Sequence, residues 1–581
     1  MTSLDTGAGT VGPSGRSVAG TERRELWIAL ALLGLLSAVC CSPLFGGGWY
    51  SNHELIRPIA RALAAYHEVA AGDLYPRWVT TAYLGKGAPL FNFYSPAFSL
   101  LPAYAHALGL PLLLALKLEI FVLFAVGATG VYLWVRRHLG HFGGLVASIL
   151  YLFAPYHFVD VYVRGATAEF AALAPLGFLF WAIDELLERF SVRGLATLGL
   201  ASAGIVLSHF LGALMIAPFA AAYALARAGV RRVGWAALGR VTMGAILGAA
   251  LCAFYWLPAL AEVNALSAER LRTNNTGYLS PYLHFVHPSQ WFDTSWGFGG
   301  SVPDPYVDEM SFQVGALILV AVIASVLLSW HLERTGRRFV LLSVALGCGA
   351  LWLTSAASRP WYVLLKPYEM VQFPWRFLGV VTLFMAAGGG GFVCAITERR
   401  RVFGPVAAAA VAAAAVLLSV PHRRVMLEVP MEDETATLDA RVAADLFSAK
   451  FGNSDEYLPK DAGIDAANST PALPAPRGIG VEVGAVRAGG TEVTFDVTAQ
   501  AGEGIAVVPW HFFPGWRATL DGRAWPLKPG PDGLIALWVP EGRHVARVRF
   551  GTTPPRVVGW LLAIAGLAAL AGLAVRERGW R

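Results

Sequence analysis

Apolar runs long enough to cross a lipid bilayer recur along the chain, and they restrict its fold more than any other feature. In lipid every backbone polar group must be hydrogen-bonded within the protein, so such runs form helices. A run of about 20 residues spans the bilayer, and the sequence predicts a polytopic α-helical membrane protein with about twelve transmembrane helices. The predicted spans lie near 26–46, 115–135, 142–158, 168–187, 194–209, 210–228, 235–258, 311–331, 338–356, 376–396, 403–420 and 555–575.

Charge is scarce and unevenly placed. Charged residues make up 14% of the chain, against roughly 25% in soluble globular proteins, which excludes a soluble enzyme. The arginines cluster between apolar runs, at 23–24, 136–137, 231–232, 337–338, 399–401 and 576–578. Such clusters are typical of cytoplasmic loops. A nucleic-acid partner is not indicated, because no basic face interleaved with aromatic residues accompanies the net charge of +6.

The charge pattern also predicts orientation. With a cytoplasmic N-terminus, twelve spans place every arginine cluster inside and leave three polar pieces outside, at 47–114, 259–310 and 421–554. Both termini are then cytoplasmic, and we expect a multi-pass protein of the bacterial inner membrane with its large domain outside. The five cysteines lie in apolar runs without metal-type spacing, so we expect neither a disulfide nor a zinc site.

Four regions differ in composition. Residues 1–22 are rich in Gly, Ser and Thr, and we predict a disordered cytoplasmic N-terminus. Residues 23–420 form the predicted transmembrane domain, and 555–581 the final helix and the cytoplasmic C-terminus. Between them, residues 421–554 carry Gly-Pro turns and alternating runs such as 492–497. Period-two alternation between turns predicts short antiparallel strands and hence a β-sandwich-like domain.

The first outer loop contains polar residues that lipid does not explain. His53 and Glu54 follow the first span, and Arg57 and Arg61 come next at helical spacing, so the two arginines share one face. Such a face can hold a phosphate or pair with carboxylates. Tyr94 lies further along the same loop. The alternative is an interfacial helix with solvated charges and an aromatic belt.

A second polar cluster joins two later spans on the same side. Asp160, Arg164 and Glu169 are costly at a membrane boundary unless they face a protein interior or a water-filled cavity. A structural Arg–carboxylate pairing is the alternative. His209 and the Trp375-Arg376 pair also end or begin spans on that side. Four separate segments therefore deliver charged groups to one face, where chance would scatter them over both.

Several short motifs resemble a known family. They are Gly-x-Leu-Tyr-Pro-Arg-Trp at 72–78, Phe-Asn-Phe-Tyr-Ser-Pro at 91–96, Tyr-Val-Arg-Gly-Ala-x-Ala-Glu at 162–169, Ser-His at 208–209, Phe-Pro-Trp-Arg-Phe-Leu at 373–378, and later pieces at 455–459, 513–516, 521–522 and 540–544. In this order they resemble bacterial membrane proteins labelled "6-pyruvoyl-tetrahydropterin synthase-related". Those proteins and the similar YfhO family look like GT-C glycosyltransferases. The resemblance covers roughly residues 26–575.

The resemblance implies a reaction and a site. GT-C enzymes place an essential acidic residue in the first outer loop, which corresponds here to Glu54, as general base on an acceptor hydroxyl. Their second acidic motif corresponds to Asp160 or Glu169, and the resemblance implies that one of these carboxylates assists Glu54 in catalysis. Relatives more often show His-Asp followed by Phe-His, whereas this chain has Glu54 and then Arg57-Pro58. Cofactors stay open, including a divalent cation such as Mg²⁺ or Mn²⁺ held by Glu54 and Asp160.

The implied donor is a sugar on a polyprenyl phosphate, and the implied acceptor is a cell-envelope glycan or lipid outside the cytoplasm. The departing phosphate gathers negative charge and needs cationic groups nearby. Arg164, His209 and Arg376 are the main candidates, and His53, Arg57, Arg61, Tyr94 and Trp375 complete the predicted substrate-binding set. We therefore expect a GT-C-type membrane glycosyltransferase.

Two other classes stay open at this point. A lipid or glycan transporter also clusters charge in a helical bundle, but usually at mid-membrane and often with inverted repeats, and we find no repeat. A non-catalytic membrane scaffold of envelope assembly needs no converging carboxylates.

Overall fold

The computed structural model describes residues 13–54, 56–267, 276–430, 436–439, 457–463, 475–500 and 502–579. Most of the predicted disordered N-terminus, residues 1–12, lies outside this part of the chain, as do Asp455 and Glu456 of one motif. Helix α1, Pro13–Cys40, begins inside the segment expected to be disordered. No proline follows Pro13 before Pro43, so nothing interrupts a helix that extends upstream of the apolar run.

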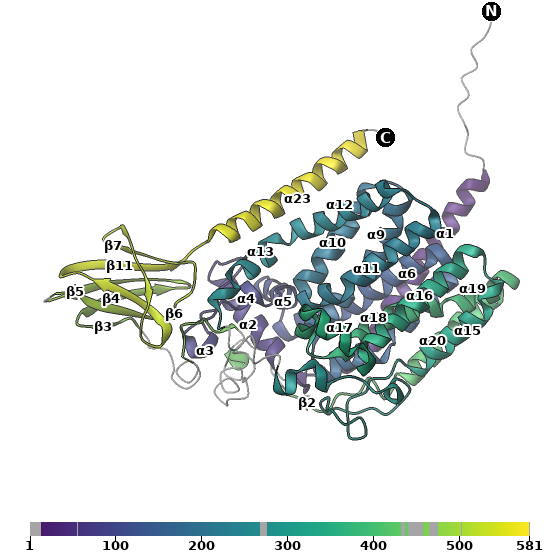
Figure 1. Ribbon diagram of the computed structural model, residues 1–581, viewed down its shortest axis with the longest axis horizontal. Coiled ribbons are helices and arrows are strands. Elements are labelled where there is room, and N and C mark those ends of the chain that lie inside the picture. The colour runs from purple at the N-terminus through teal and green to yellow at the C-terminus, as the bar shows by residue number, and fades with distance from the viewer. Residues whose placement is uncertain are drawn as a thin grey trace, which may run out of the picture.

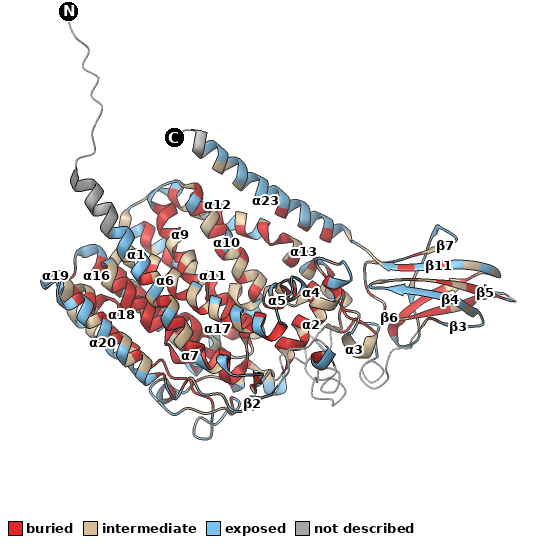
Figure 2. Cartoon of the chain, turned by 180° about the vertical axis from the view of Figure 1, so that it is seen from behind, coloured by how far each residue is buried: buried red, intermediate tan, exposed pale blue. Residues whose placement is uncertain are grey.

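Helices make up most of the chain and pack side by side in one bundle (Figure 1). The main helices of the bundle after α1 are α6 Leu112–Leu152, α9 Leu176–Glu188, α10 Val192–Ser208, α11 Phe210–Arg231, α12 Trp235–Leu251, α13 Ala253–Glu262, α15 Ala316–Leu328, α16 Arg334–Thr354, α18 Leu378–Gly389, α19 Gly391–Arg399, α20 Phe403–Leu418 and α23 Pro554–Gly579. Their facing sides are buried, while α23 is mostly exposed (Figure 2). The apolar exposed faces of such helices suit a lipid environment.

Several helices are long and apolar enough to cross a membrane. Within the described residues there are six, or up to seven if the bent pair α12–α13 is one span. The predicted span 235–258 is thus two helices bent by 70° at a break beside Cys252. Helices α10 and α20, and α15 with the turn that follows it, are apolar but shorter. The twelve-span topology stays a prediction.

Two of the predicted boundaries between neighbouring spans coincide with breaks in the helices. Helix α6 changes direction at Gly140, whose φ of +69° is accessible to glycine. Its halves fold back on each other, because Ser148 Oγ donates to the Ala128 carbonyl (2.9 Å) and Tyr132 contacts His141 (2.9 Å). The second break is at His209, which is extended between α10 and α11.

The segment predicted as the first outer loop forms a layer of short helices at one end of the bundle (Figure 1). These are α2 Arg57–Ala70, α3 Ala82–Gly85, α4 Leu90–Phe93 and α5 Ala97–Ala107. Strand β1, Trp49–Tyr50, pairs antiparallel with β2, Glu428–Val429, so the start of this loop lies beside the chain that follows α20. Between α6 and α9 the chain forms α7 Pro155–Phe158, a π-helical turn Val159–Arg164 and α8 Thr167–Leu173.

The predicted C-terminal sheet domain is confirmed, and it lies at the same end as the outer-loop helices (Figure 1). Two antiparallel sheets form it, in the orders β3-β6-β10-β9 and β4-β5-β11-β7-β8. The strands are β3 Arg477–Ile479, β4 Glu482–Gly489, β5 Glu492–Ala499, β6 Gly504–His511, β7 Trp516–Leu520, β8 Arg523–Trp525, β9 Lys528–Pro529, β10 Leu534–Val539 and β11 Gly542–Phe550. Inward side chains alternate along β5, as its sequence predicts.

The sheet domain is docked on the first outer loop. Trp78 is fully buried and belongs to the same apolar core as Phe513 and Trp516. Gly87 passes so close that a Cβ there would lie 2.4 Å from Trp78 Nε1. The His511 backbone N–H donates to the Lys86 carbonyl (2.8 Å). The sheets therefore support the loop that carries the polar residues discussed below.

A buried polar network joins the same parts. Arg556, at the start of α23, donates to Glu262 of α13 (2.8 Å), and Asn92 donates to the same carboxylate (2.9 Å). Arg77 donates to Asn92 (3.1 Å).

At the sheet surface, the His544 Nδ1 and Asp521 Oδ2 atoms lie 2.6 Å apart. This hydrogen bond raises the pKa of His544 and lowers the pKa of Asp521.

Candidate active site

A cavity of about 1100 Å³ lies where the outer-loop helices meet the bundle. Its walls come from α2, α3, the turn before α8, the α10–α11 break, and the segments 278–310 and 370–376. All predicted site residues except Asp160 line it, namely His53, Glu54, Arg57, Arg61, Tyr94, Arg164, Glu169, His209, Trp375 and Arg376. Apart from Asp160, the charged groups that were predicted to lie on one side of the membrane therefore line one cavity.

Backbone pairing joins the two polar motifs. The His53 N–H donates to the Val163 carbonyl (3.0 Å), and the Glu54 N–H donates to the Arg164 carbonyl (3.1 Å). Gly165, with φ +68°, makes this approach possible, because a Cβ there would lie 2.3 Å from Asn52 Oδ1. The pairing fixes Glu54 beside the second motif.

Glu54 is a partly exposed carboxylate between two guanidinium groups. Its Oε2 atom lies 3.7 Å from Arg57 and 3.4 Å from Arg61, and 31% of its side chain is exposed. Within the described residues that oxygen has no hydrogen-bond partner. Arg61 also donates to the Tyr94 hydroxyl (2.9 Å) and lies over its ring (4.2 Å). The carboxylate is thus held in place and faces the cavity.

His53 closes this part of the wall. Its Nε2 atom contacts the Phe298 carbonyl (2.9 Å), which ties the first outer loop to the segment 278–310. Partial burial lowers the pKa of His53, although the Phe298 carbonyl and the Glu54 charge oppose the shift. The ring is therefore uncharged at neutral pH.

The second motif forms a dense ion cluster around Arg164. Its guanidinium bonds to Asp160 and to Glu169 (2.9 Å), and it lies 4.4 Å from the centre of the Trp375 ring. Tyr156 donates to the other Glu169 oxygen (2.7 Å). Arg376 approaches Glu169 (3.2 Å) and donates to the Val371 carbonyl (2.9 Å). Each buried charge here has an opposite partner, as burial requires.

Asp160 does not line the cavity, which corrects its predicted role as a catalytic carboxylate. It is fully buried behind Arg164 on the π-helical turn, where residues four apart share a face. A carboxylate there cannot reach a substrate in the cavity. Asp160 instead positions Arg164. Glu169 does line the cavity, but two arginines and a tyrosine hydroxyl already engage it.

His209 lies at the break between α10 and α11. Its Nδ1 accepts a hydrogen bond from the Gly212 N–H (3.1 Å), so it caps α11. A neutral imidazole in this arrangement carries its proton on Nε2, which makes it a donor. The helix break therefore supplies the cavity with a histidine in a fixed tautomer.

A divalent cation does not fit the two carboxylates predicted to hold one. Glu54 already lies between two guanidinium groups, and Asp160 is separated from the cavity by Arg164. Hard cations need several oxygen ligands that converge on one point. Among the described residues no group of three or more His, Cys, Asp or Glu side chains is arranged to hold a metal ion.

Three further lining residues were not predicted as site residues, and two of them, His67 and Asp439, meet at the far end of α2. His67 Nε2 lies 2.7 Å from Asp439 Oδ1, and Tyr457 packs parallel to Phe93 with ring centres 6.2 Å apart. They come from three distant segments. Tyr457 lies in a family motif, whereas no local pattern marks His67 or Asp439.

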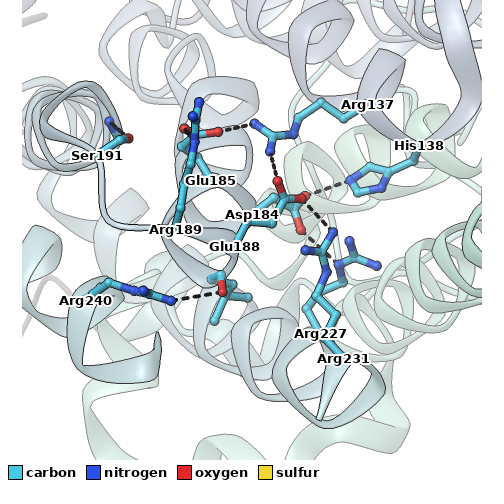
Figure 3. A network of polar contacts seen from close by, with 12 residues as sticks. Arg137, His138, Asp184, Glu185, Glu188, Arg189, Ser191, Arg227, Arg231 and Arg240 are labelled. Atoms are coloured by element: carbon cyan, nitrogen blue, oxygen red, sulfur yellow. Dashed lines mark hydrogen bonds and ion pairs between the residues drawn. The ribbon is translucent and has the colours of Figure 1, made fainter. Parts of the chain in front are cut away.

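A second ion network joins α6, α9 and α11 away from the cavity (Figure 3). Asp184 accepts from Arg227 (2.9 Å) and lies 2.7 Å from His138. Arg137 pairs with Glu185 and Glu188, which also bond to Arg189 and Arg231. None of these residues lines the cavity. The network neutralises part of two predicted cytoplasmic arginine clusters and connects the helices that carry them.

Three comparisons show distant similarity to known proteins. An uncharacterized protein of Lactococcus lactis subsp. cremoris is 22% identical over 259 residues, which is 42% of this chain and 40% of that protein. The cryo-EM structure of the arabinofuranosyltransferase AftD from Mycobacteria matches with a TM-score of 0.45, 16% identity, and coverage of 77% of this chain and 31% of that one. A mutant AftD structure matches with a TM-score of 0.41, 17% identity, and coverage of 68% and 27%.

A family model matches the larger part of the chain. It is described as "6-pyruvoyl-tetrahydropterin synthase related domain; membrane protein", and it matches residues 91–426. This range includes α6 to α20 and most of the cavity wall, and it confirms the family resemblance. The chain therefore belongs to the 6-pyruvoyl-tetrahydropterin synthase related family and is a multi-pass membrane protein.

Proposed function

We propose that this protein is a GT-C-type membrane glycosyltransferase. It transfers a sugar from a polyprenyl-phosphate-linked donor to a hydroxyl of a cell-envelope glycan or lipid. One observation carries the proposal: a single large cavity beside the apolar bundle holds the Arg-flanked carboxylate Glu54, together with Arg376 and His209. A donor and an acceptor bound together in this cavity would then meet both a general base and the cationic or hydrogen-bonding groups that an anionic leaving group needs.

The chemistry follows from the residue types. Glu54 takes the proton of the acceptor hydroxyl, and that oxygen bonds to the anomeric carbon of the donor sugar. The bond from this carbon to the phosphate oxygen breaks, and its electron pair leaves with the lipid phosphate. Arg376 and the Nε2–H of His209 stabilise the charge that develops there. Arg164, already engaged by two carboxylates, positions Glu169 and Arg376.

A topology belongs to the proposal. Twelve spans in the bacterial inner membrane leave both termini in the cytoplasm and the sheet domain outside. This is supported by the starting end of α1 and the final end of α23, which both lie away from the sheets (Figure 1). In a background without native cysteines, an impermeant thiol reagent applied from outside should label Glu503→Cys and miss Thr335→Cys. The reverse labelling would contradict this topology.

The direct test of catalysis is Glu54→Gln. The amide keeps the shape of the side chain but cannot take a proton, and general-base catalysis contributes about 10²–10⁴-fold. In proteoliposomes supplied with a panel of polyprenyl-phosphate sugars and envelope acceptors, transfer should fall by that factor. Glu54→Asp should retain part of the activity.

The matched control is Glu309→Gln, which removes an exposed carboxylate of the outer segment that does not line the cavity. It should transfer at the wild-type rate. An unchanged rate for a folded Glu54→Gln protein would remove Glu54 from catalysis.

A further inference from the structure

The cavity continues well beyond Glu54 along one face of α2. Arg57, Arg61, Ala64 and His67 line it at intervals of three or four residues, which is one face of a helix. From Arg57 to His67 this face is about 15 Å long, at 1.5 Å per residue. Helix α2 is therefore the floor of an elongated site with two different ends.

The two ends differ in charge. The four arginines among the described lining residues, at 57, 61, 164 and 376, lie at the Glu54 end or within one helical turn of it. Beyond Arg61, the described lining residues of α2, α3 and α4 include neither lysine nor arginine. The far end carries instead the His67–Asp439 pair (2.7 Å), whose side chains are 37% and 43% exposed. A phosphate suits the first end, and an uncharged polar group suits the second.

Aromatic rings line the cavity from Arg61, which donates to the Tyr94 hydroxyl (2.9 Å), toward the far end. Phe93 and Tyr457 lie nearly parallel, at 7° with ring centres 6.2 Å apart, and Tyr94 meets Tyr457 edge-on at 6.4 Å. Tyr83 contributes a further ring on α3. Aromatic faces pack against the C–H faces of sugar rings, while a carboxylate and an imidazole hydrogen-bond to hydroxyl groups.

The sheet domain and α2 together hold this end in place. The Thr80 N–H donates to Glu68 of α2 (2.7 Å), which fixes the α3 segment beside the end of α2. On the other side of α3, His511 Nδ1 contacts the Gly87 carbonyl (2.9 Å), and its backbone N–H bonds to Lys86. The far wall is thus braced from two directions, as a binding site for a specific ligand requires.

We propose that the far end, defined by His67, Tyr83, Phe93, Asp439 and Tyr457, is a subsite for an uncharged oligosaccharide, which it presents as the sugar acceptor toward Glu54. The assignment of this oligosaccharide as the acceptor rests on the proposed function. Carbohydrate binding at the subsite is expected even without turnover. The subsite favours a glycan over a lipid as the acceptor. It leaves the arginine end to the lipid phosphate.

The test measures binding at each end separately. Full-length protein in nanodiscs is labelled and applied to an array of neutral linear oligosaccharides, and the affinity for the best probe is then determined in solution. Tyr457→Ala and Asp439→Asn should each weaken glycan binding by tenfold or more. Ala64→Trp, which fills the floor of the subsite, should do the same. All three should bind polyprenyl phosphate as the wild type does.

Matched controls come from the exposed outer segment. Tyr306 is 88% exposed, and neither it nor Asp304 lines the cavity. Tyr306→Ala and Asp304→Asn should bind both probes normally, and thermal unfolding confirms that each variant is folded. If Tyr457→Ala or Asp439→Asn misfolds, Ala64→Trp still tests the subsite.

The two proposals fail in different ways. If the wild type binds no neutral glycan, or if glycan binding is unaffected by the three subsite variants, the subsite assignment is overturned. If these variants lose glycan binding while the wild type fails to bind polyprenyl phosphate, the subsite stands and the proposed transferase function falls.

Discussion

Replacing Arg376 by alanine should weaken donor binding and cost less stability than replacing Arg164 by alanine, which should damage folding first. Arg164 is ion-paired to both Asp160 and Glu169, so its removal leaves two buried carboxylates without their main partner. Arg376 shares Glu169 with Arg164. When Arg376 is removed, Glu169 therefore keeps one guanidinium and the Tyr156 hydroxyl.

The magnitudes follow from these contacts. Removing one partner of a buried ion pair costs about 3–5 kcal/mol, which is the expected loss of unfolding free energy for Arg164→Ala. Arg376→Ala removes one of several contacts to Glu169, and we expect a loss of about 1–3 kcal/mol. A charged hydrogen bond to the donor phosphate contributes about 1.5–3 kcal/mol. At 1.4 kcal/mol per tenfold, Arg376→Ala should bind polyprenyl phosphate roughly 10–100-fold more weakly.

The assay uses the full-length protein in nanodiscs, with thermal unfolding and polyprenyl-phosphate binding measured on the same samples. Arg359→Ala is the matched control, because Arg359 is an exposed arginine that stacks on Tyr282 and does not line the cavity. It should leave both quantities near their wild-type values. Wild-type donor affinity in Arg376→Ala would refute its role at the phosphate, and an unchanged stability in Arg164→Ala would refute the account of the ion cluster.

Three further predictions concern the supports of the site. Gly165→Ala should lower both Tm and transfer, because a Cβ at φ +68° collides with Asn52 and separates the paired motifs; normal values of both would show that the pairing is dispensable. Gly87→Ala should displace Trp78 and loosen the sheet domain, with faster amide exchange in β6 and unchanged exchange in α18; equal exchange in β6 would contradict the docking. His544→Gln should destabilise β11 more at pH 5.5 than at pH 8.5. The raised pKa of His544 means that its stabilisation is complete below about pH 6.5 and is lost as the pH rises through the folded pKa. Amide exchange in β11, corrected for the pH dependence of intrinsic exchange, measures this destabilisation. A larger destabilisation at pH 8.5 than at pH 5.5 would contradict the prediction.

Much of the site was predictable because membrane parity is a strong constraint. Once apolar runs and arginine clusters orient the chain, Glu54, Arg164, His209 and Arg376 must lie on one side of the bundle, and they line one cavity. Counting spans predicts on which side of the membrane a residue lies, but not how deeply its side chain is buried. Asp160 therefore looked equivalent to Glu169 in sequence, while the π-helical turn buries it behind Arg164.

The far end of the cavity could not be predicted in the same way. His67 contacts Asp439, and Tyr457 lines the same cavity, only because α2 extends along the cavity and later segments pack over it. Periodicity reports which face of a helix is polar, but it does not report which distant segment will cover that face. The bend between α12 and α13 could not be predicted either, because an apolar run long enough to span a membrane does not show whether its helix is straight.

The most direct test of the central claim is a cryo-EM structure of the protein in nanodiscs with polyprenyl phosphate bound. Density for the phosphate is expected in the cavity, within hydrogen-bond distance of Arg376 and His209, with the Glu54 carboxylate facing the adjoining space. A head group bound outside this cavity, for example at the Arg137–Glu188–Arg231 network of Figure 3, would contradict the assignment.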